Sequence, residues 1–314
     1  MKYFVTGGCG FVGSSLVDRL VTKGAVTVYD NLSSGKKDFI KEHLGKKRFK
    51  FIKADLLNIA ALKRAMRGSE AVFHMAANPE IMIGASSPKV DFEQGVVATY
   101  NVLEAMRSCG IKRIVFASSS TVFGESALRP TPENYGPMKP ISIYGASKMS
   151  CEGLISAYCH MFDMRAWIFR FANIVGKRGT HGILVDLIAR LRKDTKKLKV
   201  LGNGRQRKSY LLVEDCVDGM LFGFKHAKGP LNIFNLGTKD DIKVSAIARI
   251  LLKRLDLPGT EIFYAGGNRG WPGDVPLMLL DTSKMKRLGW RVRYNSKEAI
   301  EKAIDSLIEE KRIV

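Results

Sequence analysis

The sequence predicts an α/β fold in which a doubly wound parallel sheet is joined to a smaller C-terminal lobe. Three observations lead to this prediction. Apolar runs alternate with helical patterns through the first half of the 314 residues, and the alternation becomes irregular after about residue 174. A glycine-rich turn follows the first apolar run, as it does in many parallel sheets that bind nucleotides.

The first half contains predicted strands and helices that alternate along most of its length. Strands are predicted over residues 2–6, 25–29, 49–54, 71–75, 113–118 and 165–171. Helices are predicted over residues 11–23, 57–66, 91–108 and 145–162. Because the strands are continuously rich in Val, Ile and Phe, we expect helices to cover both faces of the sheet. Residues 1–173 are therefore expected to form the first domain.

The second half has shorter elements between loops that contain Gly or Pro, such as Gly202-Asn203-Gly204 and Gly266-Gly267. We expect residues 174–314 to form mainly a smaller lobe over the carboxyl ends of the strands, where open α/β sheets bind ligands. Some later segments, such as residues 234–236, are expected to return to the main sheet.

Composition argues against several classes of protein. The five cysteines form no C-x-x-C pair and the five histidines no cluster, so we expect neither a disulfide framework nor a metal site. No apolar stretch is long enough to span a bilayer, and the chain opens on a strand-like run without a targeting pattern. A cytoplasmic protein is the expectation.

The net charge of +21 comes from Lys and Arg residues that are dispersed along the chain. We interpret most of them as a solvated surface. A second interpretation is attraction of a doubly anionic substrate such as a nucleotide diphosphate. Nucleic-acid binding is not expected, because no recognition motif accompanies the charge.

The glycine-rich turn reads Thr6-Gly7-Gly8-Cys9-Gly10-Phe11-Val12-Gly13 and joins the first strand to the first helix. Glycines there allow a tight turn and a close approach to a pyrophosphate, whose charge the helix N-terminus stabilises. This context predicts a Rossmann-type dinucleotide site. The residues expected to contact the dinucleotide are Gly7, Gly10, Phe11, Val12 and Gly13.

Asp30 ends the second predicted strand, at the distance from the glycines that this kind of site requires. A carboxylate there accepts hydrogen bonds from the adenosine ribose and repels a 2′-phosphate, which favours NAD over NADP. The alternative role for Asp30 is that of a plain turn residue. The residues that follow are expected to line the same site: Asn31, Leu32, Ser33, Ser34 and Gly35.

Two further strand ends are expected to face the cofactor. Asp55 and Leu56 follow the third strand, where a polar side chain can reach the adenine, although Asp55 alone is also a good helix N-cap. The fourth strand ends in His74 and three residues expected beside the cofactor, Met75, Ala76 and Ala77. We interpret His74 itself as structural.

Tyr144 and Lys148 have the Y-x-x-x-K spacing, which places both side chains on one face of a helix. A free tyrosine has a pKa of about 10, too high for a base at neutral pH. A lysine ammonium one turn away, together with a positive nicotinamide ring, would favour the phenolate. The segment Ser118-Ser119-Ser120-Thr121-Val122-Phe123-Gly124 ends the strand before this helix.

Together these motifs resemble the extended short-chain dehydrogenase/reductase family, most closely its UDP-glucose/UDP-galactose 4-epimerases. The resemblance spans nearly the whole chain and includes a late Gly-Asp-Val motif. It implies NAD as cofactor, a UDP-sugar as substrate, and inversion of a hexose C4 hydroxyl through a transient 4-keto sugar. It assigns Ser119 to the reacting hydroxyl, Tyr144 as the base, and Lys148 to the nicotinamide ribose.

The resemblance also implies a set of substrate contacts. Asn173 would lie near the diphosphate or else simply cap a loop, and either Arg207 or Lys208 would supply a charge where relatives have an arginine. Met278 would line the pocket near hexose C2 and admit an N-acetyl group, or else pack in the core. The full set is Ser119, Ser120, Tyr144, Asn173, Lys199, Val200, Leu201, Arg207, Lys208, Arg269, Asp274 and Met278.

Alternatives remain open at this point. The sequence does not fix the sugar, and a UDP-glucuronate epimerase or a simple dehydrogenase is a second hypothesis. A non-catalytic NAD- or nucleic-acid-binding protein is a third, which the retained Ser119, Tyr144 and Lys148 disfavour. Ser120 and Thr121 stand where the family's 4,6-dehydratases have Asp-Glu, which disfavours dehydration.

Gly95 stands where relatives often have an asparagine that faces the cofactor. As in relatives, residues 91–108 and 145–162 are expected to pair in a homodimer through a four-helix bundle.

Overall fold

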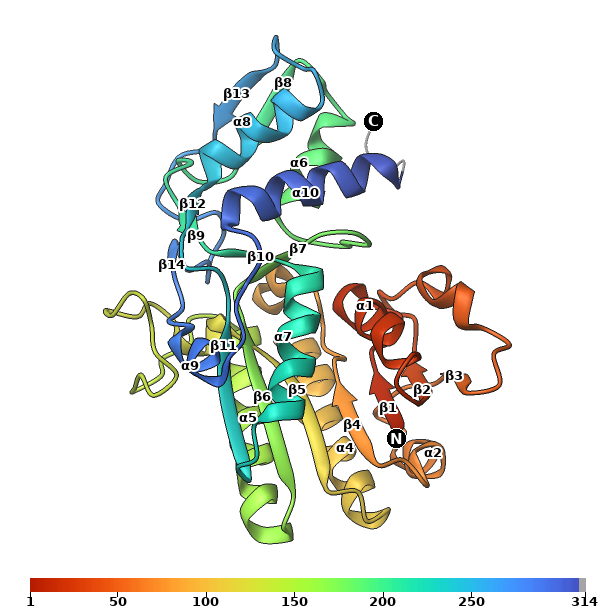
Figure 1. The fold of residues 1–314 in the computed structure, drawn as a ribbon. Coiled ribbons are helices and arrows are strands. Elements are labelled where there is room, and N and C mark those ends of the chain that lie inside the picture. The colour runs from red at the N-terminus through yellow and green to blue at the C-terminus, as the bar shows by residue number, and fades with distance from the viewer. Residues whose placement is uncertain (311–314) are drawn as a thin grey trace.

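The apolar runs of the first half and one segment of the second half form a single parallel sheet. The computed structural model describes residues 1–310, and seven strands lie in the order β11-β6-β5-β4-β1-β2-β3 (Figure 1). They are β1 Lys2–Thr6, β2 Ala25–Asp30, β3 Phe49–Lys53, β4 Ala71–His74, β5 Arg113–Ser119, β6 Arg165–Phe171 and β11 Leu231–Leu236. Strand order reverses between β1 and β4, and a crevice opens at such a point.

Helices cover both faces of this sheet. One face holds α1 Phe11–Leu20, α7 Val213–His226 and α9 Ser283–Leu288, and the other holds α2 Ile59–Met66, α4 Ala98–Ser108 and α5 Ile143–Phe162. Along β1, Val5 packs into the first of these two cores and Phe4 into the second, and both side chains are fully buried. A strand buried on both faces has no polar alternation, which is why the sequence showed continuous apolar runs. The predicted doubly wound α/β fold is confirmed.

The predicted single helix over residues 91–108 is wrong in its first part. The chain forms α3 Pro88–Asp91, then a π-helical turn over Phe92–Val97, and only then α4. Gly95 lies in the π-helical turn, and a Cβ there would come within 2.9 Å of Ser147 Oγ. The wider turn brings this backbone against α5, and such turns are frequent at functional sites.

The second lobe sits over the carboxyl ends of the large sheet (Figure 1). Its core is formed by three helices and two parallel strand pairs, with a three-stranded sheet beside them. The helices are α6 Ile183–Leu191, α8 Val244–Arg254 and α10 Ser296–Glu309. The strands are β7 Asn173–Val175 with β10 Tyr210–Leu212, β8 Lys197–Val200 with β13 Glu261–Tyr264, and β9 Arg207–Lys208 between β12 Ile242–Lys243 and β14 Leu277–Met278.

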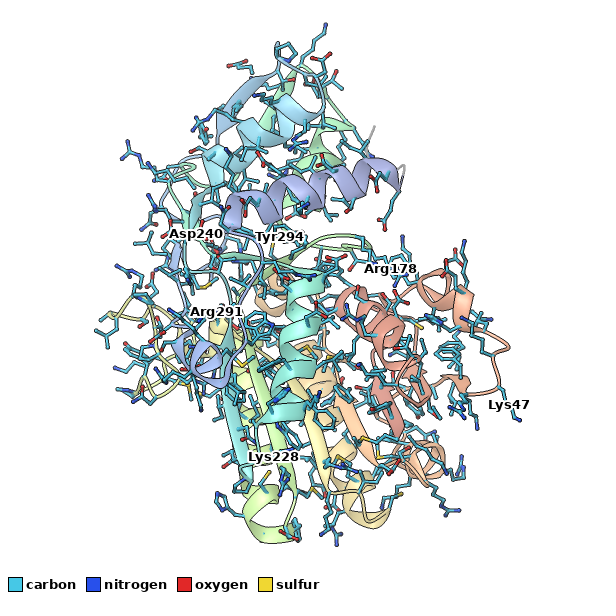
Figure 2. All side chains as sticks on the ribbon, in the orientation of Figure 1. Lys47, Arg178, Lys228, Asp240, Arg291 and Tyr294 are labelled. Carbon is cyan, nitrogen blue, oxygen red and sulfur yellow. The ribbon has the colours of Figure 1, made fainter. Side chains whose placement is uncertain are left out.

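The surface carries the excess positive charge in a dispersed form. Lys47, Lys228 and Arg291 are exposed and project from three separate parts of the molecule (Figure 2). The five cysteines are unpaired. Within residues 1–310, no helix has the length and apolar character needed to cross a membrane. The same residues contain no group of three or more His, Cys, Asp or Glu side chains placed to hold a metal ion.

Candidate active site

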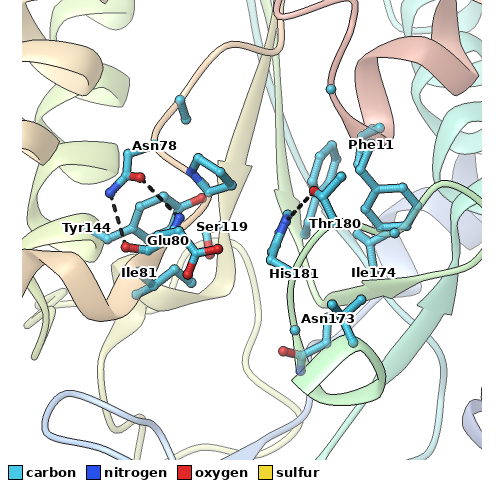
Figure 3. Close-up of a pocket in the computed structure, with 18 of the residues that line it drawn as sticks. Phe11, Asn78, Glu80, Ile81, Ser119, Tyr144, Asn173, Ile174, Thr180 and His181 are labelled. Atoms are coloured by element: carbon cyan, nitrogen blue, oxygen red, sulfur yellow. Dashed lines mark hydrogen bonds between the residues drawn. The ribbon is translucent and has the colours of Figure 1, made fainter. Parts of the chain in front are cut away.

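A cavity of about 470 Å³ lies between the carboxyl ends of the strands and the second lobe. This volume falls in the range of small-molecule sites. Its walls come from the glycine-rich turn, from the ends of β2, β4, β5 and β6, from the start of α5, and from α6 and the second lobe (Figure 3). It occupies the position at which open α/β sheets bind ligands.

The glycine-rich turn forms a cradle at one end of this cavity. Gly7 has a φ of +67°, and a Cβ there would lie 2.6 Å from the Ala76 amide nitrogen. A Cβ at Gly13 would lie 2.0 Å from the Gly7 carbonyl oxygen. Gly10 precedes α1 without any side-chain cap, so the first-turn amides remain available to an anion. The cradle therefore fits a pyrophosphate.

Asp30 lies at the end of β2, is only 8% exposed, and lines the cavity. Its Oδ2 accepts a hydrogen bond from the Cys9 amide at 2.9 Å, and its Oδ1 accepts one from the Leu32 amide at 2.8 Å. Burial raises the pKa of Asp30, while the two backbone hydrogen bonds lower it. Each oxygen retains a lone pair for a ribose hydroxyl.

Most residues predicted to contact the cofactor face the cavity, and two stand back from it. Leu32 packs its side chain against the hydrophobic core, and Asp55 accepts a hydrogen bond from Asn31 Nδ2 at 2.9 Å. Asp55 thus orients Asn31, which does line the cavity. The residues that line it are Gly7, Gly10, Phe11, Val12, Gly13, Asp30, Asn31, Ser33, Ser34, Gly35, Leu56, Met75, Ala76, Ala77, Tyr144 and Lys148.

Replacement of Asp30 tests the predicted cofactor preference. We expect Asp30→Ala to weaken NAD binding roughly 10- to 100-fold, because charge-assisted hydrogen bonds to the ribose are lost, and to relax discrimination against NADP. Titration calorimetry with both dinucleotides measures this. Asp38→Ala, which removes an exposed charge from the nearby segment Lys37–His43, is the control and should change little. A wild-type protein that prefers NADP would contradict the assignment.

Tyr144 and Lys148 lie on the face of α5 that meets the cavity, close to the end of β5. Lys148 Nζ lies 5.7 Å from the centre of the Tyr144 ring and donates a hydrogen bond to the Ala117 carbonyl at 2.7 Å. Ser119 ends β5, and its Oγ accepts hydrogen bonds from Thr121 Oγ1 at 2.9 Å and from the Thr121 amide at 3.2 Å. Figure 3 shows Ser119 and Tyr144 on the same wall.

Burial controls the titration of this pair. It raises the pKa of Tyr144 well above the ordinary value, the negative charge of Asp91 adds to this, and a hydrogen bond with Ser119 opposes it. Burial lowers the pKa of Lys148 to about 8, although the nearby Cys151, Glu152 and Asp91 act to raise it. Lys148 therefore does not by itself bring the tyrosine into the neutral range. The positive nicotinamide ring is the further contribution that would favour a phenolate.

A buried ion pair supports the catalytic wall from behind, and sequence reasoning missed it. Glu152 follows Lys148 by one helical turn, and its Oε2 lies 2.7 Å from Arg170 Nη2 on β6. Both side chains are buried. The Ser118 hydroxyl donates to Glu152 Oε1 at 2.5 Å, which ties the pair to the residue before Ser119. The only sequence signal was the four-residue spacing from Lys148.

The predicted substrate residues divide into those that face the cavity and those that do not. Lys199 is exposed because side chains alternate along β8, which turns Val200 inward. Arg207 points outward to Asp241 at 2.6 Å, whereas its neighbour Lys208 points into the cavity and pairs with Asp274. The residues that line the cavity are Ser119, Ser120, Tyr144, Asn173, Val200, Leu201, Lys208, Asp274 and Met278.

Arg269 also lies outside the cavity lining. Its Nη1 donates to the Asp274 carbonyl at 2.7 Å, and its Nη2 donates to Glu125 at 2.8 Å. Arg269 is thereby fixed behind Asp274 and not directed at the cavity. Two cavity-lining segments were not identified from the sequence, residues 78–82 and 179–187. The first segment directly follows Met75, Ala76 and Ala77, which were predicted to face the cofactor. This adjacency was the sequence signal that could have identified it.

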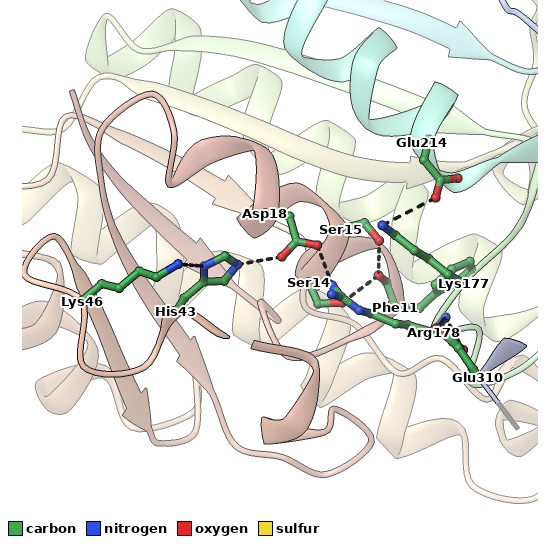
Figure 4. A network of polar contacts seen from close by, with 10 residues as sticks. All are labelled: Phe11, Ser14, Ser15, Asp18, His43, Lys46, Lys177, Arg178, Glu214 and Glu310. Carbon is green, nitrogen blue, oxygen red and sulfur yellow. Dashed lines mark hydrogen bonds and ion pairs between the residues drawn. The ribbon is translucent and has the colours of Figure 1, made fainter. Parts of the chain in front are cut away.

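The segment 176–182, called the strap here, lines the cavity beside Phe11 of the glycine-rich turn, with the centres of the Phe11 and His181 rings 6.3 Å apart, and is fastened to the first domain (Figure 4). Arg178 in the strap has a φ of +61° and donates to Asp18 Oδ2 on α1 at 2.9 Å. The Arg178 amide donates to Glu310 Oε1 at 3.1 Å, and Asp18 Oδ1 lies 2.7 Å from His43 Nε2. The strap thus bridges α1 and the last helix.

Release of the strap is expected to speed the loss of a bound dinucleotide. Arg178→Ala removes a partly buried ion pair worth about 1 kcal/mol, so the dissociation rate should rise roughly fivefold. The dissociation rate is measured from the fluorescence of the bound reduced dinucleotide while an excess of the oxidised dinucleotide displaces it. The matched control is Lys177→Ala, since Lys177 makes only a 3.8 Å contact with Glu214 across a more exposed surface. Equal dissociation rates in the two variants would argue against a role of the strap in retaining the dinucleotide.

Comparisons with known proteins agree with this geometry. The model of the NAD dependent epimerase/dehydratase family matches residues 3–237. The putative UDP-glucose 4-epimerase of Methanocaldococcus jannaschii is 30% identical over 308 residues, 96% of each chain. The UDP-glucuronate 4-epimerase of Thermodesulfobacterium geofontis is 28% identical over 316 residues, 96% of this chain and 95% of that one. The crystal structure of a UDP-galactose 4-epimerase is 40% identical, with a TM-score of 0.89 over 99% of both chains.

These likenesses extend over nearly the full chain and over both parts of the cavity. The family model alone spans more than half of the chain, from β1 through the end of β11. The glycine cradle and Asp30 provide, in this structure, the groups that a dinucleotide needs. The protein therefore belongs to the NAD-dependent epimerase/dehydratase family of enzymes, and its cofactor is NAD.

Proposed function

We propose that this enzyme interconverts the C4 epimers of a UDP-hexose, with UDP-glucose and UDP-galactose as its substrates. The observation that best supports this is the position of Ser119, Tyr144 and Lys148 on the wall between the dinucleotide cradle and the second lobe. A hexose placed there has its reacting carbon between the cofactor and the tyrosine. The relatives named above include UDP-glucose and UDP-galactose 4-epimerases.

The chemistry divides between the cofactor and three side chains. NAD, held by the glycine cradle and Asp30, would supply a reversible hydride acceptor at hexose C4, from which hydride could return to the opposite face of the same carbon. Tyr144 takes the proton of the C4 hydroxyl as the carbonyl forms and gives it back as the carbonyl is reduced. Ser119 Oγ hydrogen-bonds the same oxygen, and Lys148 holds the nicotinamide ribose and favours the phenolate. No net oxidation results.

The remaining lining residues suggest how the nucleotide is held. Val200 and Leu201 flank the uracil, Asn173 contacts the diphosphate region, and Lys208 supplies the positive charge at this end. The Thr121 hydroxyl is engaged with Ser119 at 2.9 Å and, like Ser120, cannot act as an acid or base for dehydration. Met278 lines the cavity, and its unbranched side chain leaves room for an N-acetyl group at hexose C2.

Incubation of the purified enzyme with a panel of UDP-sugars, with chromatographic separation of the products, tests this proposal. We expect UDP-glucose and UDP-galactose to interconvert without a lasting change in absorbance at 340 nm. Conversion of UDP-N-acetylglucosamine is expected as well, from the space beside Met278. A stoichiometric rise in absorbance with no epimer formed would instead indicate a dehydrogenase.

We also propose a homodimer that forms through α4 and α5. These helices expose large apolar side chains in or beside them, among which are Phe92, Tyr100 and Met161. Exposed apolar surface on neighbouring helices is typical of a helix-bundle interface. Sedimentation velocity at micromolar concentration should give the mass of two chains, and a single 34.9 kDa species would contradict the proposal. The cytoplasm remains the expected location, since all five cysteines are unpaired.

A further inference from the structure

Among the described residues, the three Lys and Arg side chains that line the cavity are each engaged by another group of the protein. Lys208 is paired with Asp274, and Arg190 on α6 donates a hydrogen bond to the Lys199 carbonyl on β8 at 2.8 Å. Both residues therefore lie on the side of the second lobe, where the nucleotide is proposed to bind. Lys148 is turned to the Ala117 carbonyl at 2.7 Å, on the side of the cofactor.

Two of the acids that line the cavity already have a partner or a role. Asp274 is neutralised by Lys208, and Asp30 belongs to the cofactor cradle. Two further acids line the cavity, Glu80 and Asp186. The Glu80 carboxylate projects into the cavity from the wall that holds Ser119 and Tyr144 (Figure 3). Within residues 1–310 it forms no ion pair with a Lys or Arg side chain.

The backbone of Glu80 is held firmly in place. Asn78 Oδ1 accepts a hydrogen bond from the Glu80 amide at 3.1 Å, and Asn78 Nδ2 donates to the Glu80 carbonyl at 3.1 Å. The same Nδ2 donates to Asp91 Oδ1 at 2.9 Å, and Asp91 is almost completely buried. This arrangement fixes the point from which the Glu80 carboxylate reaches into the cavity.

A second acid of the cavity lining, Asp186, lies near Glu80. It lies on α6, and its pKa is raised by burial, lowered by Arg190, and raised again by the charge of Glu80. The two carboxylates are therefore near enough to repel each other, and Arg190, one turn after Asp186 on α6, offsets part of the charge of Asp186. His181 does not compensate them, because burial lowers its pKa and leaves the ring neutral at pH 7.

We propose that Glu80, assisted by Asp186, makes the hexose end of the cavity select neutral UDP-hexoses and reject UDP-hexuronates. This inference rests on the proposed function and specifies its substrate class. A carboxylate at hexose C6 would add a third negative charge to this region. At a separation of about 7 Å and an effective dielectric constant of about 20, repulsion by one carboxylate weakens binding roughly 50-fold. Neutral hydroxyl groups instead donate hydrogen bonds to the same carboxylates.

A negative charge near hexose C6 would separate this enzyme from relatives of similar sequence identity that act on a uronate. A UDP-glucuronate 4-epimerase is 28% identical to this chain, only slightly less than the UDP-glucose 4-epimerase that is 30% identical. Identity over the whole chain therefore does not choose between a neutral sugar and a uronate. The charge of the side chains that face hexose C6 does.

Calorimetric titration of the NAD-loaded enzyme with UDP, UDP-galactose and UDP-glucuronate tests the proposal without requiring turnover. For the wild type we expect the Kd of UDP-glucuronate to exceed that of UDP-galactose at least tenfold. In Glu80→Gln this ratio should shrink at least about tenfold at low salt, and Glu80→Gln/Asp186→Asn should shrink it further. The matched control is Glu93→Gln, which removes a partly exposed acid of the adjoining π-helical turn that lies outside the cavity and 3.5 Å from Lys89.

Three results would overturn the proposal: equal affinities in the wild type, an unchanged ratio in Glu80→Gln, or the same shift in Glu93→Gln. UDP alone measures the nucleotide contribution and should bind all the variants alike. The same preparations are assayed for epimerisation of UDP-galactose. Failure of that assay alone refutes the proposed function, while the binding ratio still decides whether Glu80 selects against uronates.

Discussion

Tyr144→Phe is expected to lower kcat for UDP-galactose by about 10³-fold or more while NAD stays bound. The change removes the only oxygen proposed to take the C4 proton, and general acid–base catalysis of this kind contributes about 10²- to 10⁴-fold. The phenyl ring still fills the same space on α5, so the fold and the cofactor cradle should persist. Chromatographic assay of the epimers measures kcat, and absorbance of the denatured protein measures the NAD content.

The matched control is Tyr158→Phe on the same helix. The Tyr158 hydroxyl donates to Glu104 at 2.7 Å and lies outside the cavity, so its loss should change kcat by less than about threefold. Substantial activity in Tyr144→Phe would refute the assignment of the base. Loss of NAD together with activity would show that the residue acts mainly on cofactor binding.

The parts of the site that the sequence predicted are those whose geometry is local. Gly7 and Gly13 lie within one turn and the helix that follows it, and Tyr144 and Lys148 lie one turn apart on one helix. Regular backbone geometry then suffices to bring each set together. The prediction for Asp30 required one further assumption, that the second strand lies parallel to β1 and next to it. The alternation of strands and helices indicated this arrangement, and β2 does pair with β1 in parallel.

The parts that the sequence could not predict depend on register and on long-range contacts. A shift of one residue along a strand turns every side chain to the opposite face of the sheet. A two-residue strand such as β9 therefore gives no pattern that predicts whether Arg207 or Lys208 faces the cavity. Pairing of β9 with β12 and β14 makes that choice. The position of Glu80 depends on Asn78 and Asp91, thirteen residues apart in the chain, and no periodic pattern marks such a contact.

The buried pair formed by Glu152 and Arg170 was missed for the same reason, and its removal is expected to have the largest effect on stability. Glu152→Gln keeps the shape of the side chain but leaves a buried guanidinium without its carboxylate. Loss of one partner of a buried pair typically costs 3–5 kcal/mol. The remaining hydrogen bond from Arg170 Nη1 to the Glu133 carbonyl, at 2.8 Å, does not neutralise the charge.

Urea unfolding of the NAD-loaded protein at a fixed NAD concentration measures this cost, because bound ligand itself shifts apparent stability. Asp305→Asn is the matched control, since Asp305 pairs with Arg254 at 3.0 Å on the surface, and exposed pairs contribute about 1 kcal/mol or less. The double change Glu152→Met/Arg170→Met should recover much of the loss, because apolar side chains remove both buried charges. A cost for Glu152→Gln no larger than that of Asp305→Asn would show that the pair does not hold β6 against α5. With kcat measured alongside, a fall in kcat in Glu152→Gln that the double change does not restore would assign the pair a second role, the positioning of Ser119 through Ser118.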